Sequence, residues 1–67
     1  MWKITEQPSP YLAKHTLGGT YSTPMRAGDW IERNIGEIIC CEEDTDHPGF
    51  YDLFVAPGRV LAIEPVV

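Results

Sequence analysis

The chain has 67 residues, enough for one domain spanning residues 1–67, and ten Asp and Glu against five Lys and Arg give it a formal net charge of −5. Hydrophobic residues make up 43%, a globular proportion that excludes disorder driven by low hydrophobicity and high charge. The acidic balance argues against direct binding to nucleic acid, which needs clustered Lys and Arg. The longest apolar runs, Ile38 to Cys41 and Val60 to Ile63, have four residues, so no membrane span is expected.

Pro and Gly recur at short intervals, and either residue is unfavourable inside a helix. Short strands separated by turns are therefore expected. The predicted extended segments, in chain order, are Trp2 to Thr5, Thr20 to Ser22, Ile35 to Cys41, Tyr51 to Val55 and Val60 to Ile63. Tyr11 to Leu17 fits either a further strand or one helical turn, and Ala27 to Asp29 fits a turn.

Two of these strands carry the strongest signals. Ile35 to Cys41 has apolar residues on both faces, which indicates either a central position in a sheet or an interface on one side. Tyr51 to Val55 and Val60 to Ile63 flank Ala56-Pro57-Gly58-Arg59, where Pro57 suits position i+1 of a type II turn and Gly58 the positive φ at i+2. We therefore expect a terminal antiparallel hairpin that ends at Pro65.

Many short strands with frequent turns predict an all-β fold. The expected architecture is a small SH3-like barrel or barrel-sandwich of about five strands, with at most one short helical turn.

An acidic cluster between two predicted strands is the sharpest compositional feature, and we expect it at a hairpin tip. Its carboxylates are Glu42, Glu43, Asp44 and Asp46. One interpretation is a solvated loop that keeps an edge from pairing. The other is a contact surface for a partner with a basic surface, since complementary charge speeds and orients association.

Trp30 is the second candidate binding residue. In a domain this small it fits a core anchor whose indole N–H donates to a carbonyl. An exposed Trp30 would instead be an interaction hot spot, supported by Arg26 and Arg33 on either side.

The two cysteines, Cys40 and Cys41, are adjacent and therefore too close for an ordinary disulfide. Free thiols and an N-terminus without an apolar signal region predict a cytoplasmic protein. Neighbouring residues of a strand point to opposite faces, and no zinc or calcium spacing is present, so no metal site and no cofactor are expected. No nucleophile or phosphate-loop motif occurs, which predicts a non-enzymatic protein.

Three sequence pieces occur in a suggestive order from Gly19 onward. They are Gly28-Asp29 followed by Trp30, Ile31 and Glu32; then Ile35-Gly36-Glu37-Ile38; then Ala56-Pro57-Gly58 with Val60. This order resembles the lipoyl and biotinyl carrier domains and their barrel-sandwich relatives, and it implies a small β barrel. The lysines, Lys3 and Lys14, lie outside the matching region, so the resemblance implies no attachment site and no carrier activity.

The function predicted from these observations is an acidic binding module that occupies a partner's surface. A small acidic chain suits an inhibitor or adaptor that docks on a basic, nucleic-acid-handling protein, and a phage or mobile-element origin would fit. The alternative is a structural subunit that forms homodimers or larger assemblies through the second apolar face of Ile35 to Cys41.

Overall fold

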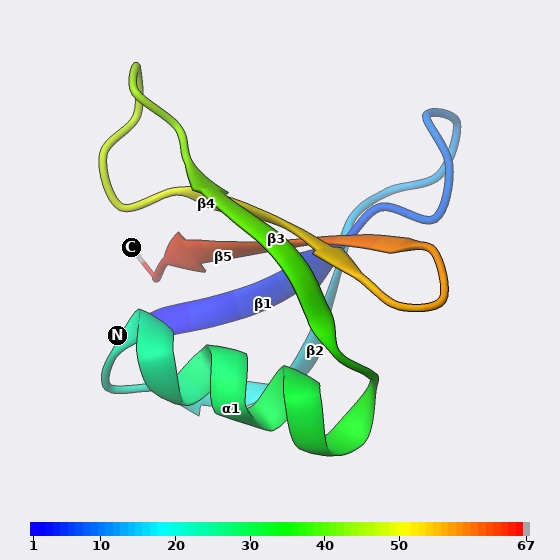
Figure 1. Cartoon of the computed structure of the whole chain (residues 1–67). Coiled ribbons are helices and arrows are strands. Elements are labelled where there is room, and N and C mark those ends of the chain that lie inside the picture. The colour runs from blue at the N-terminus through cyan, green and yellow to red at the C-terminus, as the bar shows by residue number, and fades with distance from the viewer. Residues whose placement is uncertain (67) are drawn as a thin grey trace.

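A computed structural model describes residues 1–66 and shows five strands and one helix (Figure 1). The elements are β1 (Trp2–Glu6), β2 (His15–Tyr21), α1 (Pro24–Asn34), β3 (Ile38–Glu43), β4 (Tyr51–Val55) and β5 (Arg59–Pro65). The strands form one antiparallel sheet in the order β2-β1-β5-β4-β3, so the last strand, β5, lies at its centre and pairs with the first strand, β1. The predicted small, all-β, barrel-like domain of five strands is confirmed.

The helix lies in a different place from the one expected. In the segment Tyr11 to Leu17, residues 11–14 form no regular element and the remaining residues belong to β2. The helix α1 instead spans the predicted turn at Ala27 to Asp29. Local chemistry explains the helix, because Thr23 is its N-cap and accepts the backbone N–H of Arg26 at 3.2 Å through Oγ1. Pro24 occupies the first turn, where its missing N–H is harmless.

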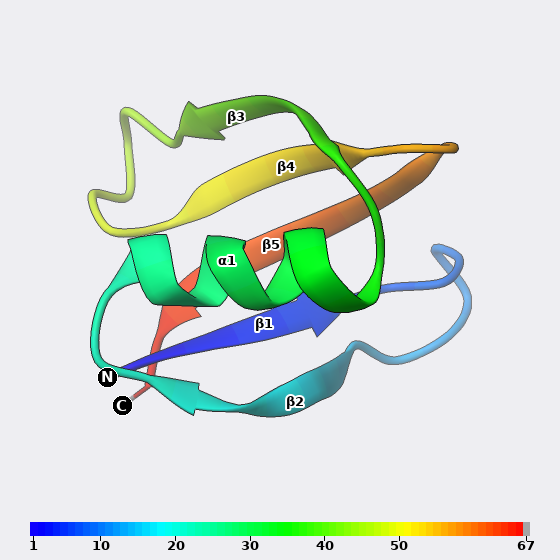
Figure 2. The same cartoon turned by 60° about the horizontal axis from the view of Figure 1, so that its bottom comes forward.

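Burial then outweighs the poor helix propensity of Gly28. Ala27 and Ile31 are four residues apart, lie on one face of α1, and are fully buried. Figure 2 shows the helix lying across one face of the sheet, in front of β1 and β5. The helix propensity lost at Gly28, about 1 kcal/mol relative to Ala, is smaller than the roughly 1.5–3 kcal/mol gained by burying one aliphatic side chain such as Ile31.

The core lies between α1 and the helix-facing side of the sheet. Strand alternation places Leu53 and Val55 of β4 beside Leu61 and Ile63 of β5 on that side, with Ile4 of β1 next to them. The buried core residues are Ile4, Ala27, Ile31, Leu53, Val55, Leu61 and Ile63.

The β1–β2 pairing contains a bulge built by two glycines. Ile4 lies opposite Leu17 and Lys3 opposite Thr20, so Gly18 and Gly19 are inserted between two consecutive partners of β1. Gly18 has a φ of 67°, and a Cβ there would collide with the Tyr21 hydroxyl.

The strand predicted at Ile35 to Cys41 begins and ends later than expected. Ile35 caps α1 by donating its N–H to the Ile31 carbonyl at 2.8 Å, and Gly36 is packed so closely on the Ala56 carbonyl that a side chain would clash. The strand β3 therefore begins at Ile38 and runs to Glu43.

The terminal hairpin of β4 and β5 is confirmed, and β4 has the predicted bounds. The prediction of a type II turn is wrong, because Gly58 is not among the residues with positive φ and the Ala56–Pro57 peptide is cis. Pro65 is the last residue of β5.

Candidate functional site

The acidic tip, defined here as Glu42, Glu43, Asp44 and Asp46, lies where β3 passes into the loop that leads to β4. Glu42 and Glu43 are not in the loop, as had been expected, but are the last two residues of β3. The Asp44 N–H donates to the Phe50 carbonyl at 2.8 Å and closes the hairpin. The tip is thus part strand end and part loop.

Two of the four tip carboxylates hold the loop in shape. Asp44 Oδ1 accepts the Asp46 backbone N–H at 2.9 Å, and Asp44 Oδ2 lies 3.2 Å from His47 Nδ1. The backbone N–H of Asp46 and then the His47 ring lower the pKa of Asp44, so this side chain is ionised at neutral pH. Glu43 accepts the Gly49 N–H at 3.1 Å.

The other two carboxylates, Glu42 and Asp46, are exposed and make no side-chain hydrogen bond or ion pair within residues 1–66. The Lys and Arg side chains of the sheet form their ion pairs away from the acidic tip. Arg59 donates Nε to Glu6 at 2.9 Å and a second N–H to the same carboxylate, while Lys3 and Lys14 both lie 3.7 Å from Glu64. Those pairs neutralise Glu6 and Glu64 around β1 and β5, and no Lys or Arg within residues 1–66 pairs with the acidic tip.

Trp30 lies far from this tip in the sheet order. It packs against Tyr21 of β2, with ring centroids 6.4 Å apart and planes tilted by 51°. The strands β2 and β3 are opposite edges of the sheet, so Trp30 and the acidic tip do not share one patch. Trp30 is half-buried against the core, and its indole N–H donates no hydrogen bond within residues 1–66, contrary to the expected bond to a carbonyl.

Arg26 and Arg33 flank Trp30, as their spacing on a helix requires. With Tyr21, Asp29 and Asn34 they line a shallow hollow of about 240 Å³. The structure therefore divides the candidate residues into an acidic surface at β3 and a mixed aromatic and basic surface at α1 and β2.

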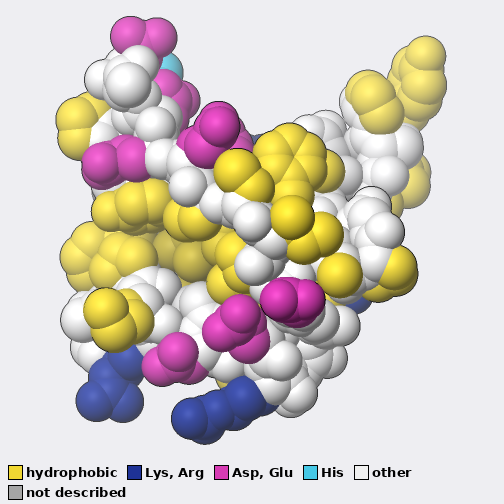
Figure 3. Space-filling model, in the orientation of Figure 1, with side chains coloured by type: hydrophobic (Ala, Val, Ile, Leu, Met, Phe, Trp, Pro, Cys, Tyr) yellow, Lys and Arg dark blue, Asp and Glu magenta, His cyan; other side chains and the backbone are white. Residues whose placement is uncertain are grey.

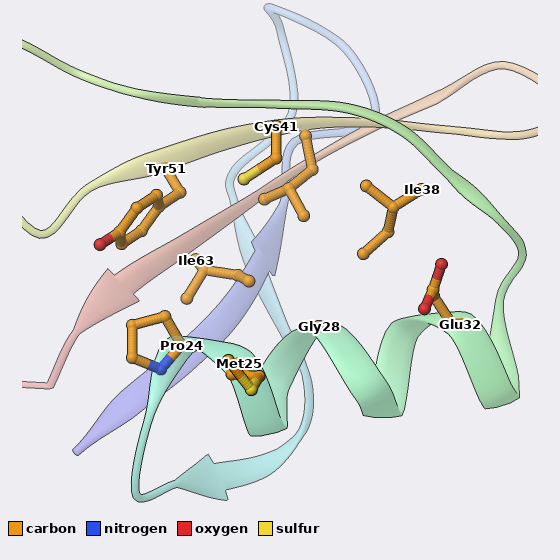
Figure 4. A pocket seen from close by; sticks show the side chains of 9 residues that line it. Pro24, Met25, Gly28, Glu32, Ile38, Cys41, Tyr51 and Ile63 are labelled. Atoms are coloured by element: carbon orange, nitrogen blue, oxygen red, sulfur yellow. The ribbon is translucent and has the colours of Figure 1, made fainter.

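A groove of about 470 Å³ lies between α1 and the sheet, and we call it the α1–β3 groove (Figure 4). Pro24, Met25, Gly28 and Glu32 line it from the helix, and Ile38, Cys41, Tyr51, Leu53 and Ile63 line it from the strands. Figure 3 shows a band of hydrophobic side chains on this side of the molecule, with acidic side chains above and below it. Glu32 is the charged side chain among the lining residues.

Sequence reasoning missed this groove. Met25, Gly28 and Glu32 occur at helical spacing, which was a usable signal, but the predicted turn at Ala27 to Asp29 concealed it. Tyr51, Leu53 and Ile63 of the groove lie far along the chain from α1, so no local pattern could have joined them to the helix.

The two cysteines point to opposite sides of the sheet, as predicted. In the register, Cys41 lies opposite Leu53 on the groove side, and Cys40 lies opposite Phe54 on the other side. Partial burial, with the neighbouring Cys40 as a second cause, raises the pKa of the Cys41 thiol. Cys41 is therefore a neutral thiol at pH 7 and a poor nucleophile.

Within residues 1–66, no three His, Cys, Asp or Glu side chains are placed so that they could hold a metal ion. The helix of this part of the chain, α1, is too short and too polar to cross a membrane. No family model, curated protein or solved structure matches the chain. The resemblance to carrier domains therefore stays a prediction.

Proposed function

We propose that this protein is a non-enzymatic binding module that docks its acidic surface on a basic protein, as an inhibitor or adaptor in the cytoplasm. The observation that carries the proposal is the segregation of charge. Within residues 1–66, carboxylates gather at the acidic tip without Lys or Arg partners, whereas three of the five Lys and Arg side chains are paired with Glu6 and Glu64. Unpaired carboxylates on one surface create a field that attracts a basic partner.

A partner that handles nucleic acid suits this surface. Such proteins carry clustered Lys and Arg that normally bind phosphates. Carboxylates accept the same charge-assisted hydrogen bonds from Arg and Lys. A rigid hairpin presenting Glu42 and Asp46 can therefore occupy a phosphate-binding surface and exclude the nucleic acid.

The test is capture of the partner at low and high salt by wild type and by the double variant Glu42→Gln, Asp46→Asn. This variant removes the two carboxylates that hold no loop hydrogen bond, so the hairpin stays intact. The matched control is Asp29→Asn, Glu37→Gln, which removes the same charge from α1 and from the chain just before β3. We expect the tip variant to lose a salt-sensitive basic partner and the control to retain it.

Equal capture by the tip variant and wild type would contradict the proposal. So would a captured partner that carries no basic surface, or one whose binding does not weaken in high salt, since exposed charge pairs are screened within about 10 Å at 0.1 M salt.

The alternative, self-assembly, has one specific observation in its favour. On the side of the sheet away from α1, Phe54 pairs in register with Val60, and they are 49% and 53% exposed. Ile39, at the register shift in β3, is 68% exposed. Sedimentation at micromolar concentration distinguishes the two: a monomer excludes assembly through this face, and a dimer abolished by Phe54→Ser, Val60→Thr supports it.

A further inference from the structure

The free edge of β3 has backbone groups beside the groove that pair with no other strand within residues 1–66. β3 pairs with β4 on one side and is the last strand of the sheet on the other. Asp44 donates its N–H to Phe50, and antiparallel strands alternate between residues that bond across the pair and residues that do not. The backbone N–H and C=O groups of Glu43 and Cys41 therefore point away from β4.

The same two residues border the α1–β3 groove with their side chains. Cys41 lines it, and Glu43 lies opposite Tyr51, which lines it as well. A strand added to this edge would run between β3 and α1, and every second side chain would point into the groove. A volume of about 470 Å³ falls within the range of pockets that bury ligands of several hundred Å³.

Charge selects the occupant. Glu32 projects into the groove from α1, and no Lys or Arg of residues 1–66 lines it. A second copy of β3 that paired antiparallel through the free groups of Cys41 and Glu43 would place Glu42 opposite Glu42 of the copy, and like charges directly opposite each other across a strand pair are destabilising. A segment with Lys or Arg residues would instead be attracted to these carboxylates.

We propose that the β3 edge and the α1–β3 groove bind an extended segment of the partner protein by strand addition. The segment places an apolar side chain in the groove between Met25 and Ile38, and its Lys or Arg residues face Glu32 and Glu43. Its main chain pairs with the free N–H and C=O groups of Cys41 and Glu43, which is how strand addition obtains affinity. This inference rests on the proposed binding function and names the kind of partner segment.

The probe is a displayed library of random linear peptides of about ten residues, a length that spans a strand of ordinary size, selected on the full chain. We expect the enriched peptides to alternate apolar residues with Lys or Arg. An enriched peptide should then slow hydrogen exchange of the Cys41 and Glu43 amides, while amides of the opposite edge strand, β2, stay unchanged. Enriched peptides without this alternation, or binding without protection at Cys41 and Glu43, would overturn the proposal.

Gly28 offers a variant that blocks the groove and keeps the fold. A Cβ built at Gly28 meets Ile38 Cδ1 at 3.6 Å, an ordinary contact, and no other atom outside its own helix within 4 Å. Gly28→Leu therefore extends a side chain into the groove, and Gly28→Ala is the matched control that fills little of it. We expect Gly28→Leu to weaken peptide binding at least tenfold and Glu32→Gln to weaken it severalfold, with Gly28→Ala losing much less than Gly28→Leu.

The two proposals can fail separately. If Gly28→Leu captures the basic partner as well as wild type while the acidic-tip variant loses it, the groove proposal is overturned and acidic docking stands. If the Cys41 and Glu43 amides are already protected in the free protein and its mass is that of a dimer, a second copy occupies the edge, and the groove proposal is likewise overturned. If both variants still capture the basic partner, the groove proposal and the acidic-docking proposal are both overturned.

Discussion

Arg59, the first residue of β5, clamps the carboxylate of Glu6, the last residue of β1, with two N–H donors. The pair joins the ends of two neighbouring strands across a separation of 53 residues in the chain. The hydrogen bond from Arg59 lowers the pKa of Glu6 and raises that of Arg59, and His15 Nε2 lies 3.8 Å from the same carboxylate. Arg59 is well exposed, so solvent screens much of this attraction.

Glu6→Gln should therefore lower the free energy of unfolding by about 0.5 to 1 kcal/mol at pH 7, as for a well-formed surface pair. Because the pKa of Glu6 is lowered in the folded state, its contribution is present above the unfolded pKa and is lost as the pH falls through the folded value. Urea unfolding of both proteins at several pH values checks this. The difference should shrink below about pH 4, near the reference pKa of Glu. A difference that grows in acid would contradict the assignment.

The N-cap of α1 gives a second prediction. Thr23→Ala removes the acceptor for the Arg26 N–H and should destabilise the domain by about 0.5–2 kcal/mol. Thr23→Ser keeps the hydroxyl and should retain most of the stability. Thermal unfolding measures both variants, and equal losses for Ala and Ser would show that the hydroxyl is not the cap.

Replacing each of two glycines by alanine should change the free energy of unfolding in opposite directions. Gly28→Ala improves helix propensity in open space and should stabilise the domain by up to about 1 kcal/mol. Gly36→Ala places a Cβ against the Ala56 carbonyl, which belongs to the chain backbone and cannot easily move, so it should destabilise. Denaturant midpoints of the two variants provide the comparison, and stabilisation by Gly36→Ala would contradict the close packing of the β3 entry on the β4–β5 turn.

The thiol in the groove gives a prediction about pH. In a Cys40→Ser background, the rate at which iodoacetamide alkylates Cys41 should rise with a midpoint above the ordinary cysteine pKa, because burial raises the pKa of Cys41. At pH 7 alkylation should be slower than for a free cysteine. The background also removes the smaller influence of Cys40, so the remaining elevation reports burial in the groove. A midpoint at or below that of free cysteine would show that the groove does not desolvate the thiol.

The sequence was most informative where structure is local. Strand alternation predicted β4 with the correct bounds, because Tyr51, Leu53 and Val55 share the side facing α1. The acidic tip was predicted from neighbouring residues of the sequence. Glu42 and Glu43 lie at the end of β3 instead of in the adjoining loop.

Features that depend on distant residues could not be predicted in the same way. The helix was missed because Pro24 and Gly28 indicate turns locally, whereas the burial of Ala27 and Ile31 against distant strands outweighs that preference. The α1–β3 groove follows from that helix, so it was missed too. The two candidate regions, Trp30 and the acidic tip, were grouped by chemistry, and only the strand order separates them.

The position of β5 between β1 and β4 has a consequence for how the domain folds. Leu61 and Ile63 of β5 complete the core, and the Val66 N–H donates to the Met1 carbonyl at 2.9 Å, so the chain ends meet. Without β5 the sheet divides into two separate hairpins, and an isolated two-stranded hairpin is marginally stable at best. The core can therefore form only once β5 has been added to the other strands. Deletion of β5 should likewise unfold the whole domain rather than shorten it.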